Sequence, residues 1–226
     1  MKYVLILATG RSGSTTLMRI INTIPGTLIY GENQQLIWSL IQCHIQLERF
    51  KTHAIHCQKK VKALCNKTDI TYNDYIDNKF HPIWYTNANL DNIKFKLTDI
   101  ISDIIPYTNE EVIGFKDILR LNDDNISIIK KFIEIFPDTK IIVNYRNDIE
   151  SQSKSKWYAN DINAIDTLKN KNELCINLHN TFKEHTYLME FSQIFNIEKI
   201  KDMFRFLGKE LNESEYINII NNKLDY

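Results

Sequence analysis

The stretch Tyr3–Ile21 reads YVLILATGRSGSTTLMRII, with an apolar run, a glycine loop and an amphipathic segment in that order. The apolar run Tyr3–Leu7 predicts a buried strand, and the residues from Leu17 onward predict a helix. A glycine turn between a strand and a helix start forms a cradle for phosphate, because consecutive backbone N–H groups and the positive helix end converge on one point. The sequence therefore predicts a phosphate-binding loop at Ala8–Thr16.

This loop differs from the P-loop of ATP-binding proteins at two positions. The P-loop motif reads GxxxxGK[ST], whereas Ala8 replaces its first glycine and Ser14 stands at its lysine position. That lysine normally holds the β- and γ-phosphates of a nucleoside triphosphate, and here only Arg11 supplies a cation nearby. The loop suits a ligand that places a single phosphate there, and a glycine turn without function is the alternative.

The segment Gly10–Thr16 resembles the 5′-phosphosulfate loop of sulfotransferases, which transfer a sulfuryl group from 3′-phosphoadenosine 5′-phosphosulfate (PAPS) to a hydroxyl or an amine. The resemblance implies that Arg11 contacts the bridging or sulfuryl oxygens and that the residues around it bind the donor. The donor-binding residues that it assigns in this loop are Arg11, Ser12, Gly13, Ser14, Thr15 and Thr16.

A second segment, Asp138–Asn147, predicts a buried parallel strand that ends in Arg146. Sulfotransferases have a similar strand, whose arginine joins a serine of the next helix around the 3′-phosphate of the donor. A guanidinium group binds phosphate in a bidentate manner, with charge-assisted hydrogen bonds of about 1.5–3 kcal/mol each. An arginine in a surface salt bridge is the alternative for Arg146.

The partner serine of Arg146 is ambiguous in this chain. The residues Ile149–Tyr158 predict a helix, and the usual serine position of the family is occupied by Lys154. A shift of one residue selects Ser153 or Ser155. Trp157 resembles the aromatic residue that often follows this serine in glycan sulfotransferases, which favours Ser155.

The apolar run that precedes Lys116 and Asp117 predicts another strand, and we expect Lys116 at its carboxyl end, where ligands gather in open α/β sheets. Tyrosylprotein sulfotransferases have a similar Lys-Asp pair, which implies that Lys116 contacts the transferring sulfuryl oxygens. A strand-end lysine in water is the alternative. Asp117 also keeps open a P-loop kinase of a small metabolite, because such enzymes end a strand in an aspartate that holds Mg²⁺.

Thr27–Tyr30 predicts a strand that ends in Gly31 and Glu32. Bacterial trehalose-type and tyrosylprotein sulfotransferases have a similar Gly-Glu pair, which implies that Glu32 is the general base that deprotonates the acceptor hydroxyl. The alternative is an acid at a helix entrance. The pair favours a carbohydrate acceptor, with peptide tyrosine and small alcohols behind it. A nucleotide-binding protein without turnover is the non-enzymatic alternative.

The chain has 28 Lys and Arg and 28 Asp and Glu among 226 residues. Its net charge is therefore zero, which does not predict binding to nucleic acid or to an anionic membrane. No stretch approaches the ~20 apolar residues of a membrane span, and the N-terminal run is too short for a signal peptide, so we expect a cytoplasmic protein. The four cysteines lack C-x-x-C spacing. We expect no metal site and no disulfide framework.

The alternation of helices and strands predicts one α/β domain over residues 1–226, a P-loop-like three-layer fold with a mostly parallel central sheet flanked by helices. Residues from about 57 to 90 are the least regular, and we expect an insertion there on the acceptor side. The other predicted elements are helices over Gln34–Gln58, Asn125–Phe136, Asp161–Glu184, Ile197–Leu207 and Glu213–Lys223, and a strand over Thr186–Phe191.

Overall fold

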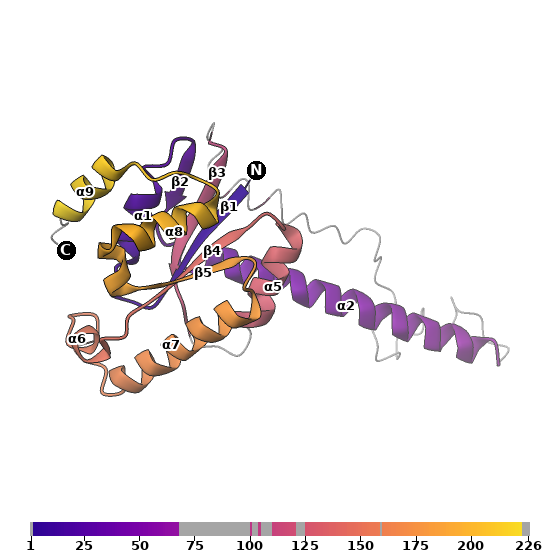
Figure 1. The fold of residues 1–226 in the computed structure, drawn as a ribbon. Coiled ribbons are helices and arrows are strands. Elements are labelled where there is room, and N and C mark those ends of the chain that lie inside the picture. The colour runs from indigo at the N-terminus through magenta and orange to yellow at the C-terminus, as the bar shows by residue number, and fades with distance from the viewer. Residues whose placement is uncertain are drawn as a thin grey trace. The chain divides into compact units, whose positions relative to one another are not determined.

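The computed structural model describes residues 2–67, 100, 104, 110–120, 125–158 and 160–222. The chain divides into two compact units, one formed by Met1–Leu36 with Ile105–Tyr226 and the other by Ile37–Ile104. We call the first the sheet unit, because it contains every described strand (Figure 1).

The second unit contains most of the long helix α2, Leu36–Cys65. The expectation of irregular structure from residue 57 onward was wrong for Cys57–Cys65, which continues this helix. This stretch contains three Lys together with Gln58, Ala63 and Leu64, all of which favour helix. The rest of the predicted insertion, residues 68–90, lies outside the described residues, so the insertion and the single-domain boundaries stay predictions.

The sheet has five described strands in the order β2-β3-β1-β4-β5, and all neighbouring pairs are parallel. This confirms the predicted α/β class. The central strand β1 pairs with β3 on one side and β4 on the other, and its continuous apolar sequence is typical of a strand buried on both faces. The strands are β1 Lys2–Ala8, β2 Thr27–Tyr30, β3 Val112–Ile118, β4 Lys140–Tyr145 and β5 Thr186–Glu190.

Apart from α2, which extends beyond the predicted end at Gln58, the described helices lie within a few residues of the predicted ranges, with one exception. The helix that follows Arg146 ends at Ser153, and turns continue the chain to Tyr158. The helical elements of the sheet unit are α1 Ser14–Ile21, α5 Asn125–Ile135, α6 Ile149–Ser153, α7 Ala164–Thr181, the 3₁₀ helix η3 Phe191–Phe195, α8 Ile197–Leu207 and α9 Glu213–Asn221.

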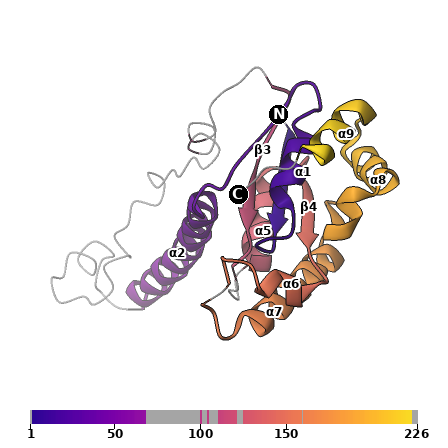
Figure 2. The same cartoon turned by 90° about the vertical axis from the view of Figure 1, so that its left-hand side faces the viewer.

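The sheet lies between two helical layers (Figures 1 and 2). On one face, Val4 and Ile6 of β1 share an apolar cluster with residues of α1, α8 and α9, including Phe204. On the other face, the ring of Phe132 in α5 packs edge-on against Tyr3, with 5.8 Å between ring centroids. These two clusters form the predicted three-layer arrangement.

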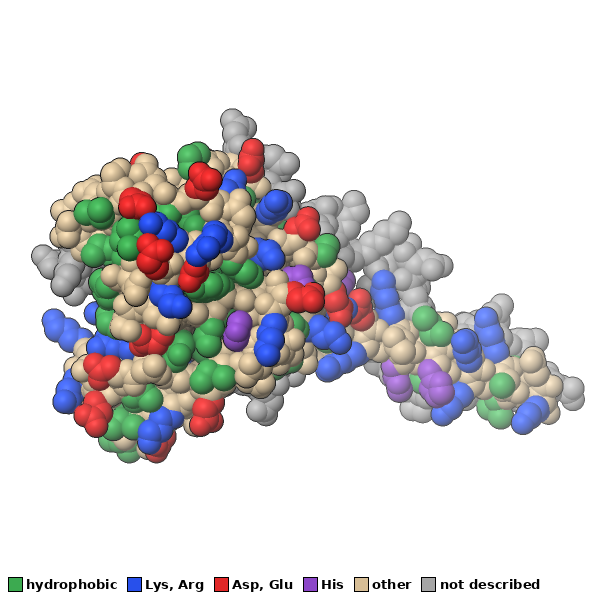
Figure 3. Space-filling view, viewed as in Figure 1, with side chains coloured by type: hydrophobic (Ala, Val, Ile, Leu, Met, Phe, Trp, Pro, Cys, Tyr) green, Lys and Arg blue, Asp and Glu red, His purple; other side chains and the backbone are tan. Residues whose placement is uncertain are grey.

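Acidic and basic side chains are interspersed on the face of the sheet unit seen in Figure 3. On α8, for example, Lys201 pairs with Glu198 at 3.0 Å and with Glu213 of α9 at 2.8 Å. No helix among the described residues is both long and apolar enough to cross a membrane.

Candidate functional site

The loops after β1, β2, β3 and β4 meet at the carboxyl edge of the sheet, where open α/β folds bind their ligands. A cavity of about 490 Å³ lies there, within the range of about 300–1,000 Å³ that is typical of small-molecule sites. Its lining residues are Gly10, Arg11, Gly13, Ser14, Thr15, Thr16, Arg19, Glu32, Lys116, Ile118, Arg146, Ser155, Trp157, Phe191, Phe195, Ile219 and Ile220.

The glycine loop enters α1 through Gly13, which has the left-handed φ of 79°. A Cβ at Gly13 would lie 2.7 Å from Cδ1 of Ile194, so a larger residue would have to shift that side chain in addition to adopting the left-handed φ. No side chain caps the start of α1 among the described residues, so the first N–H groups of the helix have no side-chain acceptor. They are suited to bind an anion in the cavity.

The side chain of Ser12 points away from the cavity, unlike its predicted neighbours. Its hydroxyl is buried and lies 2.6 Å from Oδ1 of Asn144 in β4 and 2.5 Å from the carbonyl oxygen of Thr9. Asn144 in turn donates to the carbonyl of Met189 in β5 at 3.1 Å. Ser12 and Asn144 therefore tie the glycine loop to two strands, and only the backbone of Ser12 remains for a ligand.

The guanidinium of Arg146 lies in the cavity directly after β4. Its central carbon lies 4.4 Å from the ring centroid of Phe191, and one terminal nitrogen lies 3.2 Å from Oδ2 of Asp148. Its Nε is buried without a hydrogen-bond partner among the described residues. Hydrogen bonds from Ser151, and to a smaller extent the contact with Arg146, lower the pKa of the exposed Asp148 carboxyl.

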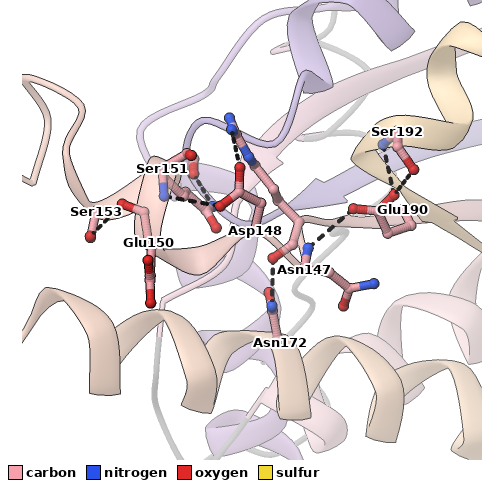
Figure 4. A network of polar contacts seen from close by, with 11 residues as sticks. Asn147, Asp148, Glu150, Ser151, Ser153, Asn172, Glu190 and Ser192 are labelled. Atoms are coloured by element: carbon pink, nitrogen blue, oxygen red, sulfur yellow. Dashed lines mark hydrogen bonds and ion pairs between the residues drawn. The ribbon is translucent and has the colours of Figure 1, made fainter.

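Two further side chains fix the backbone around Arg146. Asn172 of α7 donates to the carbonyl oxygen of Arg146 at 2.7 Å. Glu190, at the end of β5, accepts from the N–H of Asn147 at 3.1 Å and from the N–H of Ser192 at 2.7 Å (Figure 4). Glu190 thus joins the turn after Arg146 to η3, which carries Phe191.

Of the two candidate serines, only Ser155 lines the cavity. Its hydroxyl is buried and has no hydrogen-bond partner within the described part of the chain. Ser153 instead donates to the carbonyl oxygen of Glu150 at 2.9 Å, within its own helix. Ser155 thus lines the same cavity as Arg146, whereas Ser153 is not among its lining residues.

Lys116 and Glu32 form an ion pair at the cavity wall. Lys116 is 7% exposed, so the alternative of a strand-end lysine in water was wrong. It also lies inside β3, two residues before the strand ends, because β3 continues through Asp117 to Ile118. Asp117 is buried, accepts from the N–H of Ile118 at 2.9 Å and is not among the cavity-lining residues.

Backbone strain is concentrated in the same loops. The non-glycine residues with positive φ in the described part of the chain are Arg11 at 64°, Gln34 at 57° and Gln35 at 68°. Such residues cluster at functional sites, where the surrounding contacts hold them. Gln35 donates to the carbonyl of Ile118 at 3.2 Å, which connects the loop after Glu32 to β3.

Among the described residues that line the cavity, the charged groups are Arg11, Arg19, Lys116 and Arg146 against one acid, Glu32. This excess of cations suits a ligand with several anionic groups. Sequence reasoning missed Arg19, although it lies one turn after Thr15 and Thr16 on the same face of α1. It also missed the apolar wall made by Phe191, Phe195, Ile219 and Ile220.

Solved structures of sulfotransferases are among those to which this chain is similar. The sulfotransferase domain of the olefin synthase from Synechococcus PCC 7002 superposes with a TM-score of 0.52 and 15% identity, over 99% of this chain and 78% of that one. The chain has the sulfotransferase fold. A sulfotransferase from Alicyclobacillus acidocaldarius gives a TM-score of 0.46 and 11% identity, over 92% of this chain and 81% of that one. No protein-family model and no curated protein matches the sequence.

Metal ligands do not gather among the residues of this sulfotransferase fold that the structure describes. No group of three or more His, Cys, Asp or Glu side chains is placed there to hold a metal ion. The four cysteines are free thiols, and Cys57 and Cys175 are buried.

Proposed function

We propose that the protein is a PAPS-dependent sulfotransferase. The observation that carries the proposal is the pairing of two anion-binding features in one cavity: the glycine loop at the start of α1, and Arg146 with Ser155 after β4. PAPS has anionic groups on both sides of its ribose, a 5′-phosphosulfate and a 3′-phosphate, so it requires two such features. The sulfotransferase fold supports the same assignment.

In this proposal, the 5′-phosphate binds the backbone N–H groups of Gly13, Ser14, Thr15 and Thr16 and the hydroxyls of the last three. Arg11 contacts the bridging or sulfuryl oxygens. These groups line the cavity at the positive end of α1.

The 3′-phosphate binds the guanidinium of Arg146 and the hydroxyl of Ser155. The buried Nε of Arg146 and the buried hydroxyl of Ser155 both lack partners among the described residues, and a phosphate would supply acceptors for both. We assign this role to Ser155 alone, because the hydroxyl of Ser153 is used within α6.

The reaction is an in-line sulfuryl transfer. The acceptor oxygen attacks the sulfur, the bond between sulfur and the 5′-phosphate oxygen breaks, and adenosine 3′,5′-bisphosphate leaves with that electron pair. Glu32 takes the proton of the acceptor hydroxyl. Lys116 and Arg11 stabilise the negative charge on the transferring and leaving oxygens. The ion pair between Glu32 and Lys116 supports these roles, because it holds base and cation side by side at the cavity wall.

We further propose a carbohydrate as the acceptor, on the resemblance of Gly31-Glu32 to the pair in trehalose-type enzymes. No metal takes part in this reaction scheme, because the cations come from the protein. The P-loop kinase has less support, since Asp117 is buried away from the cavity lining.

Calorimetric titration with adenosine 3′,5′-bisphosphate, ADP and Mg-ATP tests the proposal. We expect the bisphosphate to bind more than about tenfold more tightly than ADP, because each charge-assisted hydrogen bond to the 3′-phosphate contributes about 1.5–3 kcal/mol. Equal binding of ADP, or tighter binding of Mg-ATP, would contradict it and favour the kinase. Sulfuryl transfer from PAPS to a panel of glycans, tyrosine peptides and small alcohols then identifies the acceptor class.

A further inference from the structure

One short segment, residues 152–158, both contacts the glycine loop and lines the cavity. After α6, the N–H of Ser155 donates to the carbonyl of Gln152 at 3.2 Å, and the N–H of Tyr158 donates to the carbonyl of Ser155 at 2.9 Å. Hydrogen bonds between residues three apart are typical of 3₁₀ turns. These two hydrogen bonds continue the chain in turns from Gln152 through Ser155 to Tyr158.

Gln152 contacts the glycine loop without lining the cavity. It is fully buried, and its amide nitrogen donates to the carbonyl oxygen of Gly10 and to Oγ1 of Thr9, the latter at 3.2 Å. Gly10 is itself buried, so this carbonyl has little access to water as a substitute donor. Gln152 is not among the residues that line the cavity.

Tyr158 packs against the same turn. A Cβ added to Gly10 would lie 2.7 Å from the hydroxyl oxygen of Tyr158 but 3.5 Å from the nearest ring carbon. Burial raises the pKa of the Tyr158 phenol, with a smaller contribution from Asp161, so its hydroxyl stays neutral. Ser155, between these two residues in sequence, faces the cavity instead.

We propose that Gln152 is a positioning residue for the donor site: it fixes the glycine loop at a set distance from the subsite of Arg146 and Ser155. The inference rests on the proposed function, because it assigns the loop to the 5′-phosphate and Ser155 to the 3′-phosphate. Gln152 contacts neither phosphate. It acts through Gly10, and it belongs to the segment that carries Ser155.

The test separates the two phosphate subsites with ligands that each carry only one of the two phosphates. Calorimetry measures the affinities of adenosine 5′-monophosphate, adenosine 3′-monophosphate and adenosine 3′,5′-bisphosphate for the wild type and for Gln152→Met. Methionine has a similar length but no hydrogen-bond donor. We expect about a tenfold loss for the 5′-monophosphate and the bisphosphate, and less than about a twofold change for the 3′-monophosphate.

Ser153→Ala is the matched control, because Ser153 lies on the same segment and its hydroxyl bonds only to the carbonyl of Glu150 in the described part of the chain. It should change none of the three affinities by more than about twofold. If Gln152 had only a structural role, Gln152→Met would lower the melting temperature but would not weaken binding of the 5′-monophosphate more than that of the 3′-monophosphate. Equal losses for both, or no loss for either, would overturn the inference.

A second pair of variants probes the position of the same glycine turn without changing Gln152. Gly10→Ala should weaken binding of the 5′-monophosphate, because the new methyl group meets the hydroxyl of Tyr158. Adding Tyr158→Phe removes that oxygen and should restore most of the affinity. Failure of Gly10→Ala to weaken binding, or of Tyr158→Phe to restore it, would overturn the inference even if Gln152→Met did not fold.

The wild-type titration keeps the two proposals apart. A wild type that bound the bisphosphate no more tightly than ADP would overturn the proposed function and this inference with it. A wild type that preferred the bisphosphate, together with an unchanged Gln152→Met, would overturn the inference alone.

Discussion

The ammonium group of Lys116 contacts the carboxylate of Glu32, although 84 positions separate them in the sequence. The pairing of β2 with β3 brings them together, since Glu32 follows β2 and Lys116 lies in β3. A buried ammonium without a partner is strongly destabilising, and Glu32 supplies that partner. The proposed base and the proposed cation therefore depend on each other.

Replacing Glu32 by glutamine should lower the rate of sulfuryl transfer by about 10²–10⁴, because the amide cannot take the acceptor proton. Affinity for adenosine 3′,5′-bisphosphate should change little, since Glu32 is assigned to the acceptor and not to the donor. Single-turnover rates and calorimetry measure the two effects separately. Glu134→Gln, on the surface of α5, is the control and should leave both unchanged. A normal rate for Glu32→Gln would remove the base assignment.

Lys116→Met should lower the rate by about 10²–10³, the usual effect of losing one preorganised group that stabilises transition-state charge. Combining it with Glu32→Gln tests the coupling of the two residues. We expect the double variant to lose less stability than the sum of the single variants, because Glu32→Gln alone leaves the buried Lys116 charge unpaired. Urea unfolding of the four proteins gives the coupling energy. Additive losses would argue against the ion pair.

Ser155→Ala should weaken binding of adenosine 3′,5′-bisphosphate by about 5- to 20-fold, because it removes one hydrogen bond to a charged phosphate. Binding of adenosine 5′-monophosphate should be unchanged, since that ligand lacks the 3′-phosphate. Ser153→Ala should affect neither ligand. If Ser153→Ala, and not Ser155→Ala, lowered the affinity for the bisphosphate, the two serines would have to exchange roles.

The choice between these serines marks a limit of sequence reasoning at this site. The apolar runs of β1 and β4 predicted their strands, and the glycines and hydroxyl residues between β1 and α1 predicted the loop. A continuous helix after Arg146 would have kept helical spacing through Tyr158. The chain instead leaves the α-helical path after Ser153, and the turns bring Ser155 to the cavity.

Other features of the site depend on contacts between distant parts of the chain. The inward direction of the Ser12 hydroxyl requires Asn144 across the β1–β4 pair, and the cavity wall formed by Ile219 and Ile220 requires α9 to pack on α1. The polar Asn144 after three apolar strand residues indicates a buried hydrogen bond, and could have predicted this contact from the sequence. For Ile219 and Ile220 the sequence contains no such signal, because apolar residues on a terminal helix fit any core.

Gly114 tests the strand register on which the position of Lys116 depends. A Cβ at Gly114 would lie 1.6 Å from the carbonyl oxygen of Val4, its partner in β1, so Gly114→Ala must force β3 away from β1. We expect a loss of at least about 3 kcal/mol in urea unfolding, or a failure to fold, because a backbone atom cannot move aside as a flexible side chain does.

Gly31→Ala is the matched control for Gly114→Ala. A Cβ at Gly31 would meet nothing within 4 Å, and its φ is not in the left-handed region. The change should alter the free energy of unfolding by less than about 1 kcal/mol, and the smaller entropy of the unfolded chain favours a slight gain. If Gly114→Ala were as stable as Gly31→Ala, then Gly114 could not lie against Val4. In that case Lys116, two residues further along β3, would no longer be held in register at the cavity beside Glu32.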